Sequence, residues 1–277
     1  MSGQSVTLTG TKLWVDDTGE LDLPPVVCLH SLFLDNTMFD DFTAAAAGRF
    51  RVIRPEFRGQ GRSAPATEDS VDMDTCARDI EELLDEMDLG PVHMLVQSMG
   101  GDVGFRFAAR RLDVVRSMVV LGSSARAEPP EQLERFRRWV DDVGERGFVD
   151  DILETTMEIM FGQSTRSDPA KQEMLEHWRS RIAAVPPTLR PAMAGVIERS
   201  SCLDVLPKIT VPVLVVSGEE DLPRPPAWAD EVVEALPNVE LLRLSKVGHS
   251  PTLEAPEIVI PRILAFFSDV DAPSRGA

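Results

Sequence analysis

Tyrosine is absent from the 277 residues of the chain, although 12 phenylalanines and four tryptophans are present. No mechanism here can therefore use a phenol as an acid, a base or a nucleophile. Long apolar runs are also missing, since no stretch approaches the roughly 18 apolar residues of a membrane-spanning helix. The first residues lack the basic segment and apolar run of a signal peptide. We expect a cytoplasmic protein.

Cysteine is scarce. Only Cys28, Cys76 and Cys202 occur, and no two of them have the Cys-x-x-Cys spacing. The sequence therefore indicates neither a disulfide framework nor a structural zinc site. Cys28 lies in a short apolar run, so we expect a buried side chain rather than a reactive thiol.

Basic residues are too few for a polyanion-binding protein. The chain has 28 Lys and Arg against 46 Asp and Glu, for a net charge of -18. Nucleic acids and anionic membranes need a basic surface, so we expect neither as a partner. Hydrophobic and charged residues, at 43% and 27%, are typical of globular proteins. Association of the chain with copies of itself stays open.

Short strand-like runs alternate with helical patterns through most of the chain. This alternation predicts an α/β fold, with a mostly parallel eight-stranded sheet covered by helices on both faces. The expected strands are at residues 5–9, 12–15, 25–29, 51–54, 92–97, 117–121, 211–217 and 239–244, and the clearest helices at 72–88, 99–111 and 256–267.

One interval breaks this alternation. Residues 128–207 show helical periodicity, several prolines and no convincing strand. We expect residues 1–127 and 208–277 to form the sheet core, and residues 128–207 to form a helical cap, or lid, over the active site. Its large apolar side chains either line a cavity or pack the cap against the sheet.

The segment with the clearest chemistry is QSMGG at residues 97–101, where an apolar strand runs directly into a helix with Ser98 at the junction. A tight strand-to-helix turn strains the serine backbone and presents its hydroxyl. The helix N-terminus then stabilises negative charge beside it. Val96 departs from the usual G-x-S-x-G pattern, and a serine that only caps the helix is the alternative interpretation.

A serine nucleophile needs a base, and the chain has only four histidines. His93 lies inside a strand, His177 in the cap, and His30 at the end of a buried strand. His249 follows the last strand, in a loop at the same sheet edge as Ser98, so it is the best candidate.

An acid that orients this histidine should follow another strand. GEED at residues 218–221 supplies three carboxylates, of which Asp221 is preferred and Glu220 is the alternative. The order Ser98, Asp221, His249 is that of α/β-hydrolase triads. An oxyanion hole would use the backbone N–H of Met99 and that of Leu32, with Phe33 as the alternative.

Five ordered motifs carry a family resemblance. They are HSLFLDNTMFD at 30–40, RVIRPEFRGQGRS at 51–63, QSMGG at 97–101, GEED at 218–221 and GHSPTLEAPE at 248–257. The sequence resembles the α/β-hydrolase superfamily, and within it the 3-oxoadipate enol-lactonases and related small serine esterases. No specific motif matches in the cap.

The residues and the resemblance together predict a serine hydrolase. It would cleave a small, partly apolar ester or lactone through an acyl-enzyme, without a metal or organic cofactor. Serine at the nucleophile position disfavours epoxide hydrolases and haloalkane dehalogenases, which resemble this fold but use an aspartate there. The side chains expected to contact the substrate are Phe33, Trp139, Met160 and Phe161, whereas Arg106 and Arg126 are expected to be solvated.

Three alternatives share the fold. Carbon–carbon bond hydrolases resemble the chain near Ser98, but they usually carry tryptophan where Ser250 follows His249. Cofactor-free perhydrolases need only small changes around the same acyl-enzyme. A hydrolase-fold protein that only binds a ligand would lack turnover and labelling of Ser98.

Overall fold

A computed structural model describes residues 2–272 of the chain. Eight strands form one sheet in the order β1-β2-β4-β3-β5-β6-β7-β8. Strands β1, β2 and β4 pair antiparallel, and the other pairings are parallel. The strands are β1 Ser2–Leu8, β2 Thr11–Asp17, β3 Pro25–Leu29, β4 Arg51–Pro55, β5 Val92–Gln97, β6 Val115–Leu121, β7 Val213–Gly218 and β8 Val239–Leu244. The predicted fold class is confirmed.

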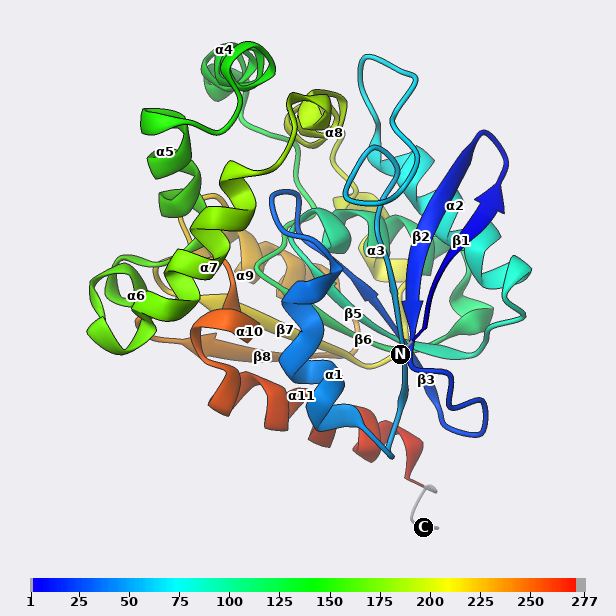
Figure 1. The fold of residues 1–277 in the computed structure, drawn as a ribbon. Coiled ribbons are helices and arrows are strands. Elements are labelled where there is room, and N and C mark those ends of the chain that lie inside the picture. Colours follow the sequence, from blue (N-terminus) through cyan, green and yellow to red (C-terminus); the bar gives the residue numbers. More distant parts are fainter. Residues whose placement is uncertain (1, 273–277) are drawn as a thin grey trace.

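Helices cover both faces of the sheet (Figure 1). Helix α1 packs beside α11 on one face, and α2 packs beside α3 on the other. The α-helices are α1 Asp40–Ala46, α2 Met73–Glu86, α3 Met99–Arg110, α4 Pro130–Arg146, α5 Asp150–Met160, α6 Gln163–Ser167, α7 Gln172–Ala183, α8 Arg190–Ile197, α9 Pro226–Ala235, α10 Pro251–Glu254 and α11 Pro256–Asp271. The 3-10 turns are η1 Asn36–Phe39, η2 Leu112–Val114, η3 Pro169–Lys171, η4 Pro187–Leu189 and η5 Leu203–Lys208.

The interval between β6 and β7 is helical, as its periodicity predicts. It contains α4 to α8, and α4 packs against α8 while α5 packs against α7. Figure 1 shows these helices in green and yellow-green, gathered to one side of the sheet. Pro130 is the first residue of α4 and Pro191 the second of α8, and in this first turn the missing backbone N–H removes no helical hydrogen bond.

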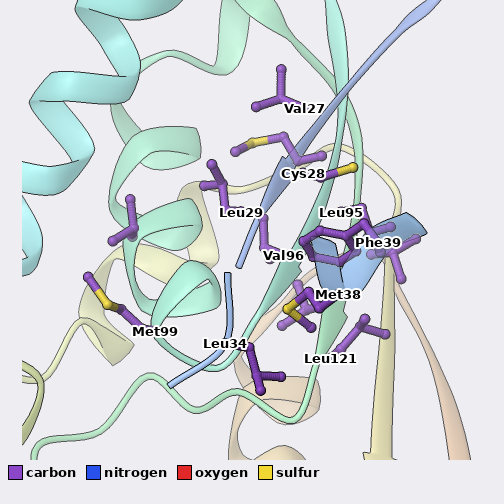
Figure 2. Packing of buried hydrophobic residues seen from close by; sticks show 14 of the residues in the cluster. Val27, Cys28, Leu29, Leu34, Met38, Phe39, Leu95, Val96, Met99 and Leu121 are labelled. Carbon is purple, nitrogen blue, oxygen red and sulfur yellow. The ribbon is translucent and has the colours of Figure 1, made fainter. Parts of the chain in front are cut away.

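The buried core reaches the ends of the central strands. In Figure 2 the side chains of β3 and β5 pack together close to Met38 and Phe39. Leu29, the last residue of β3, is paired with Val96 of β5, and Gln97 is paired with Leu121 of β6. Loops that follow these parallel strands therefore leave the sheet at one edge, where side chains from distant parts of the sequence meet.

None of the helices within residues 2–272 is both long enough and apolar enough to cross a membrane.

Candidate active site

Ser98 occupies the turn between β5 and α3. Its backbone has φ 52° and ψ −112°, a left-handed conformation that few residues other than glycine adopt. Such a conformation costs about 1–3 kcal/mol and persists only where the surrounding structure enforces it. Here the turn leaves Ser98 6% exposed, at the wall of a cavity. The residue is therefore held in a strained backbone at a surface that a ligand can reach.

Gly100 explains how α3 can begin so close to the sheet. A Cβ atom at this position would lie 2.2 Å from the carbonyl oxygen of Leu29, inside any permitted contact. The glycine therefore lets the first turn of α3 approach the end of β3. This approach brings the N-terminus of the helix, with its partial positive charge, beside Ser98.

The ring of His249 contacts the carboxylate of Asp221. The Nδ1 atom of the ring lies 3.0 Å from each carboxylate oxygen, and both residues are buried. The backbone N–H of Arg224 also donates to Asp221, at 2.8 Å. Because Nδ1 faces the carboxylate, Nε2 is the nitrogen left for other partners. Ser98 and His249 line the same cavity, although no hydrogen bond joins their side chains within residues 2–272.

Glu220, the alternative acid, faces elsewhere. Its carboxylate accepts hydrogen bonds from the backbone N–H of Ser164, at 2.7 Å, and from the Ser164 hydroxyl, at 2.5 Å. These bonds hold the pKa of Glu220 below its usual value against the opposing effect of burial. The adjacent Asp221 thus contacts the histidine, while Glu220 holds the start of α6.

Glu254 connects the histidine loop to the helical segment. Its fully buried carboxylate accepts backbone hydrogen bonds from Gly248 and Ser250, the two neighbours of the histidine, each at 2.9 Å. It also accepts from the backbone N–H of Gly162 at 2.9 Å and from the Thr165 hydroxyl at 2.7 Å. Sequence reasoning missed this role, because only the fold brings α6 next to this loop.

The other three histidines are not among the residues that line the cavity beside Ser98. Nδ1 of His30 lies 2.7 Å from the carbonyl oxygen of Ser31, and Nε2 accepts from the backbone N–H of Phe57 at 3.2 Å. Burial lowers the pKa of His30, which agrees with a neutral ring that accepts this bond. His93 packs inside the sheet and lies 2.8 Å from the Ser117 hydroxyl. His177 is exposed on α7.

Two expected N–H donors are free of protein acceptors. Among the described residues, neither the backbone N–H of Leu32 nor that of Met99 donates a hydrogen bond, and the same holds for Phe33. Leu32 and Phe33 line the cavity beside Ser98. A developing negative charge near the serine can therefore find donors in this loop and at the start of α3.

The cavity beside Ser98 has a volume of about 200 Å³ and mostly apolar walls. Phe33, Trp139 and Met160 line it, and the rings of Phe33 and Trp139 meet edge to face at 5.6 Å. Phe161 lies outside this cavity. Helix α5 ends at Met160, and the extended backbone of Phe161 turns its side chain into the buried core instead.

One end of the cavity is charged, a feature that sequence reasoning missed. Arg199, Arg224 and Glu128 line it, and Asp102 lies buried behind them. Arg199 follows α8 and Arg224 precedes α9, so no local pattern connects them before the chain folds.

Arg106, in contrast, was expected to be solvated, and this expectation is wrong. Its side chain is 5% exposed, and it donates to the carbonyl oxygen of Ser200 at 2.7 Å and to that of Asp102 at 3.0 Å. Arg126 is half-buried and pairs with Glu231 at 3.0 Å. Neither arginine is among the residues that line the cavity beside Ser98.

No group of three or more His, Cys, Asp or Glu side chains within residues 2–272 is arranged to hold a metal ion. The three cysteines are free and buried.

Residues 24–256 match a family model described as alpha/beta hydrolase fold. Among curated proteins, the chain is 25% identical to the pimeloyl-[acyl-carrier protein] methyl ester esterase of Nitrosomonas europaea, over 84% of the chain and 92% of that protein. It is 26% identical to polyketide synthase ThaQ of Burkholderia thailandensis over 89% of the chain, but it spans only 12% of that much longer protein.

Two solved structures are similar over nearly the whole chain. An esterase from Thermogutta terrifontis, solved with malate bound, has a TM-score of 0.88 and 29% identity, over 98% of this chain and 100% of that one. The enol-lactonase from Burkholderia xenovorans has a TM-score of 0.87 and 22% identity, over 96% and 100%. At this identity, the likeness to the enol-lactonase concerns the fold.

Proposed function

Because the chain belongs to the alpha/beta hydrolase fold family, we propose that it is a serine hydrolase that cleaves a carboxylic ester or lactone of a small, partly apolar substrate. The observation that carries this proposal is the buried contact between Asp221 and His249, at the cavity where Ser98 sits in its strained turn. The similarity to esterases of Thermogutta terrifontis and Nitrosomonas europaea supports ester cleavage.

Each member of this triad has a separate role. The Ser98 oxygen attacks the substrate carbonyl carbon, and its proton passes to Nε2 of His249. Asp221 keeps the proton of the neutral ring on Nδ1 and stabilises the imidazolium that forms. His249 then gives its proton to the leaving oxygen, which leaves an acyl group on Ser98. A water molecule, deprotonated by the same nitrogen, releases the acid and restores the serine.

The oxyanion is stabilised by the backbone N–H groups of Leu32 and Met99. Both groups lack protein acceptors, so they can bind the oxygen without first breaking a hydrogen bond. A donor of this kind is worth about 3–4 kcal/mol of transition-state stabilisation. No tyrosine exists to supply a phenol instead, since the sequence contains none.

Residues 128–207 act as a cap in this proposal. The side chains of Trp139 and Met160 from this segment line the cavity together with Phe33 of the core, and the rings of Phe33 and Trp139 are in contact. These three apolar side chains would hold the non-polar part of the substrate. Phe161 takes no direct part, because it lies outside the cavity.

The proposal is tested by hydrolysis of p-nitrophenyl acetate and butyrate. Ser98→Ala should abolish turnover, and kcat/KM should fall by roughly 10³ or more in His249→Ala and about 10²–10⁴ in Asp221→Asn. Glu220→Gln is the matched control, because its carboxylate bonds Ser164 and not the histidine. Hydrolysis that survives in Ser98→Ala at the wild-type rate would contradict the proposal.

The same ester substrates also test the perhydrolase alternative. Addition of hydrogen peroxide and acetate measures peracid formation, which a perhydrolase would catalyse and which would also require Ser98. Turnover of simple esters in the absence of peroxide favours hydrolysis to an acid.

A further inference from the structure

Two buried arginines lie at the cavity wall. Arg199 has a fully buried side chain, and the side chain of Arg224 is 6% exposed. Both line the cavity that also contains Ser98 and His249. Arginine is almost never buried without a partner, because removal of its charge from water costs several kcal/mol. Their presence at a mostly apolar substrate cavity therefore calls for a specific explanation.

Each of the two guanidinium groups has a nitrogen without a hydrogen-bond acceptor among residues 2–272. Arg199 donates to Glu128 at 3.0 Å and to the carbonyl oxygens of Arg126 and Val196 at 3.1 and 2.8 Å, yet its Nη2 has no hydrogen-bond partner among residues 2–272. Arg224 donates through Nη1 to the carbonyl oxygen of Pro223 at 2.8 Å, and its Nε is likewise without a partner. A buried donor that stays unpaired costs roughly 1–3 kcal/mol.

The charges that line the cavity are unequal in number. Two arginines face one carboxylate, that of Glu128, which lies 3.0 Å from Arg199 Nη1 and 3.8 Å from Arg224 Nη1. Asp102 lies behind them, 3.5 Å from Arg199 and 3.9 Å from Arg224. Burial raises the pKa of Asp102, while the charges of Arg199, Arg224 and Arg106 act to lower it. Burial lowers the pKa of Arg224 to about 10, so this arginine is still charged at neutral pH.

We propose that Arg199 and Arg224 form an anion subsite that binds a free carboxylate on the substrate, so that the enzyme cleaves the ester or lactone of a small acid that keeps one ionised carboxyl group. This inference rests on the proposed hydrolysis at Ser98. A carboxylate has two oxygens that can accept from two guanidinium groups, which are planar donors suited to this pairing. Among the charged residues that line the cavity, a bound carboxylate would meet two arginines and a single carboxylate, that of Glu128.

The subsite also explains why the apolar side chains and the charged residues lie in one cavity. Phe33 and Trp139 would contact the carbon chain of the substrate, while the arginines fix its far end. Binding at a remote group can be used to place the scissile carbonyl at the serine. The small volume of the cavity, about 200 Å³, suits an acid of a few carbons.

The kinetic test compares the monomethyl and dimethyl esters of glutaric acid at pH 7. These substrates share the scissile bond and the carbon chain, and only the monomethyl ester carries a carboxylate. The wild-type ratio of kcat/KM, monomethyl over dimethyl, should exceed about tenfold, since hydrogen bonds to a charged group are worth that much or more. Arg224→Gln and Arg199→Gln should lower the ratio about tenfold each. A ratio taken within one variant cancels general loss of activity.

Two further variants keep the test independent of folding defects. Glu128→Gln should raise the ratio, because it removes the carboxylate at the cavity wall that competes for the arginines, and a simple loss of structure would not do this. Arg137→Gln changes an exposed arginine of α4 and should leave the ratio as in wild type. Wild-type, Arg199→Gln and Arg224→Gln ratios that agree within twofold would overturn the subsite, even with full Ser98-dependent turnover of both esters.

Calorimetry separates this inference from the proposed function. Ser98→Ala should bind monomethyl glutarate at least about tenfold more tightly than dimethyl glutarate, and Arg224→Gln in that background should remove the difference. This measurement needs no turnover. If the chain hydrolyses no ester, the proposed function fails while the binding difference still supports the subsite. Equal binding of the two esters would overturn the subsite.

Discussion

Val96 of β5 faces Gly104 of α3 across the junction that carries Ser98. A Cβ atom at Gly104 would lie 3.2 Å from Cγ1 and 3.4 Å from Cγ2 of Val96. The helix thus lacks a side chain at the point where the strand has a branched one. In the related pattern G-x-S-x-G a glycine stands at the position of Val96. Here the strand keeps a valine, and the space it needs is provided by a glycine on the facing helix.

This relationship predicts an energetic coupling. Gly104→Ala should cost about 1 kcal/mol more in unfolding free energy when Val96 is present than in a Val96→Ala background, because the added methyl group crowds the valine. Urea unfolding of the four proteins of the double-mutant cycle measures the difference. Val52→Ala serves as a control background, since Val52 is a buried valine of β4. A coupling with Val96 no larger than with Val52 would contradict the packing account.

Glu254 is expected to position His249 without touching the substrate. Glu254→Gln turns an amide NH₂ toward backbone donors that need an acceptor, so the histidine loop should shift. We expect kcat to fall by about tenfold to a hundredfold with a smaller change in KM, the effect of a catalytic group displaced by about 1 Å. The pH profile of kcat should also move, which a loss of stability alone would not cause. Glu257→Gln, an exposed neighbour, is the control.

Stability should fall as the pH drops below about 6.5. Burial lowers the pKa of His30 below 6.5, its value in the unfolded chain, so on unfolding in acid this ring takes up a proton that the folded protein excludes. The contribution of His30 is therefore fully present above pH 6.5 and decreases below it, by at most about 1.4 kcal/mol per pH unit. His93 acts in the same direction.

Urea unfolding of wild type and His30→Asn between pH 7.5 and 5.5 checks this expectation. The variant should be less stable at pH 7.5 but should lose less stability on acidification. His177→Gln, at an exposed position, should follow the wild type. Identical pH slopes for wild type and His30→Asn would contradict a neutral, buried His30.

The three cysteines should be inert in the folded protein. Burial raises the pKa of Cys28 and Cys76 and raises that of Cys202 to about 12, so little thiolate exists at pH 8. We expect no reaction with 5,5′-dithiobis(2-nitrobenzoic acid) over an hour in native buffer, and release of three equivalents in guanidinium chloride. Rapid native labelling of any one of them would show that its surroundings open readily.

Local patterns were enough to predict the sheet and the three residues of the proposed triad. The central strands are runs of buried apolar residues that end at sharp turns, and both the runs and the turns are visible in the sequence. Ser98 follows β5 directly, whereas Asp221 and His249 lie in the loops that follow β7 and the partly exposed edge strand β8. Parallel strands place their carboxyl ends at one edge of the sheet, so these three local patterns were enough to predict that the residues lie near one another.

Other features depend on contacts that no local pattern encodes. Helices α1 and α9 have only 7 and 10 residues, so each shows too few turns for a clear helical periodicity in the sequence. Phe161 follows the end of α5 with an extended backbone and is buried outside the cavity, a position that the helical periodicity of this segment does not indicate. Arg199 and Arg224 meet only because the helical segment returns to the sheet beside β7. Their burial, rather than their sequence context, indicates the subsite.

The most direct test of the proposed triad is covalent labelling with a fluorophosphonate, followed by peptide mass spectrometry. Wild type should gain one adduct, on the peptide that carries Ser98, and Ser98→Ala should gain none. His249→Ala should react far more slowly, because the serine then lacks its base. Ser31→Ala removes another buried hydroxyl at the same cavity and should still be labelled at Ser98. An unlabelled Ser98 in a wild-type protein that hydrolyses esters would contradict the account.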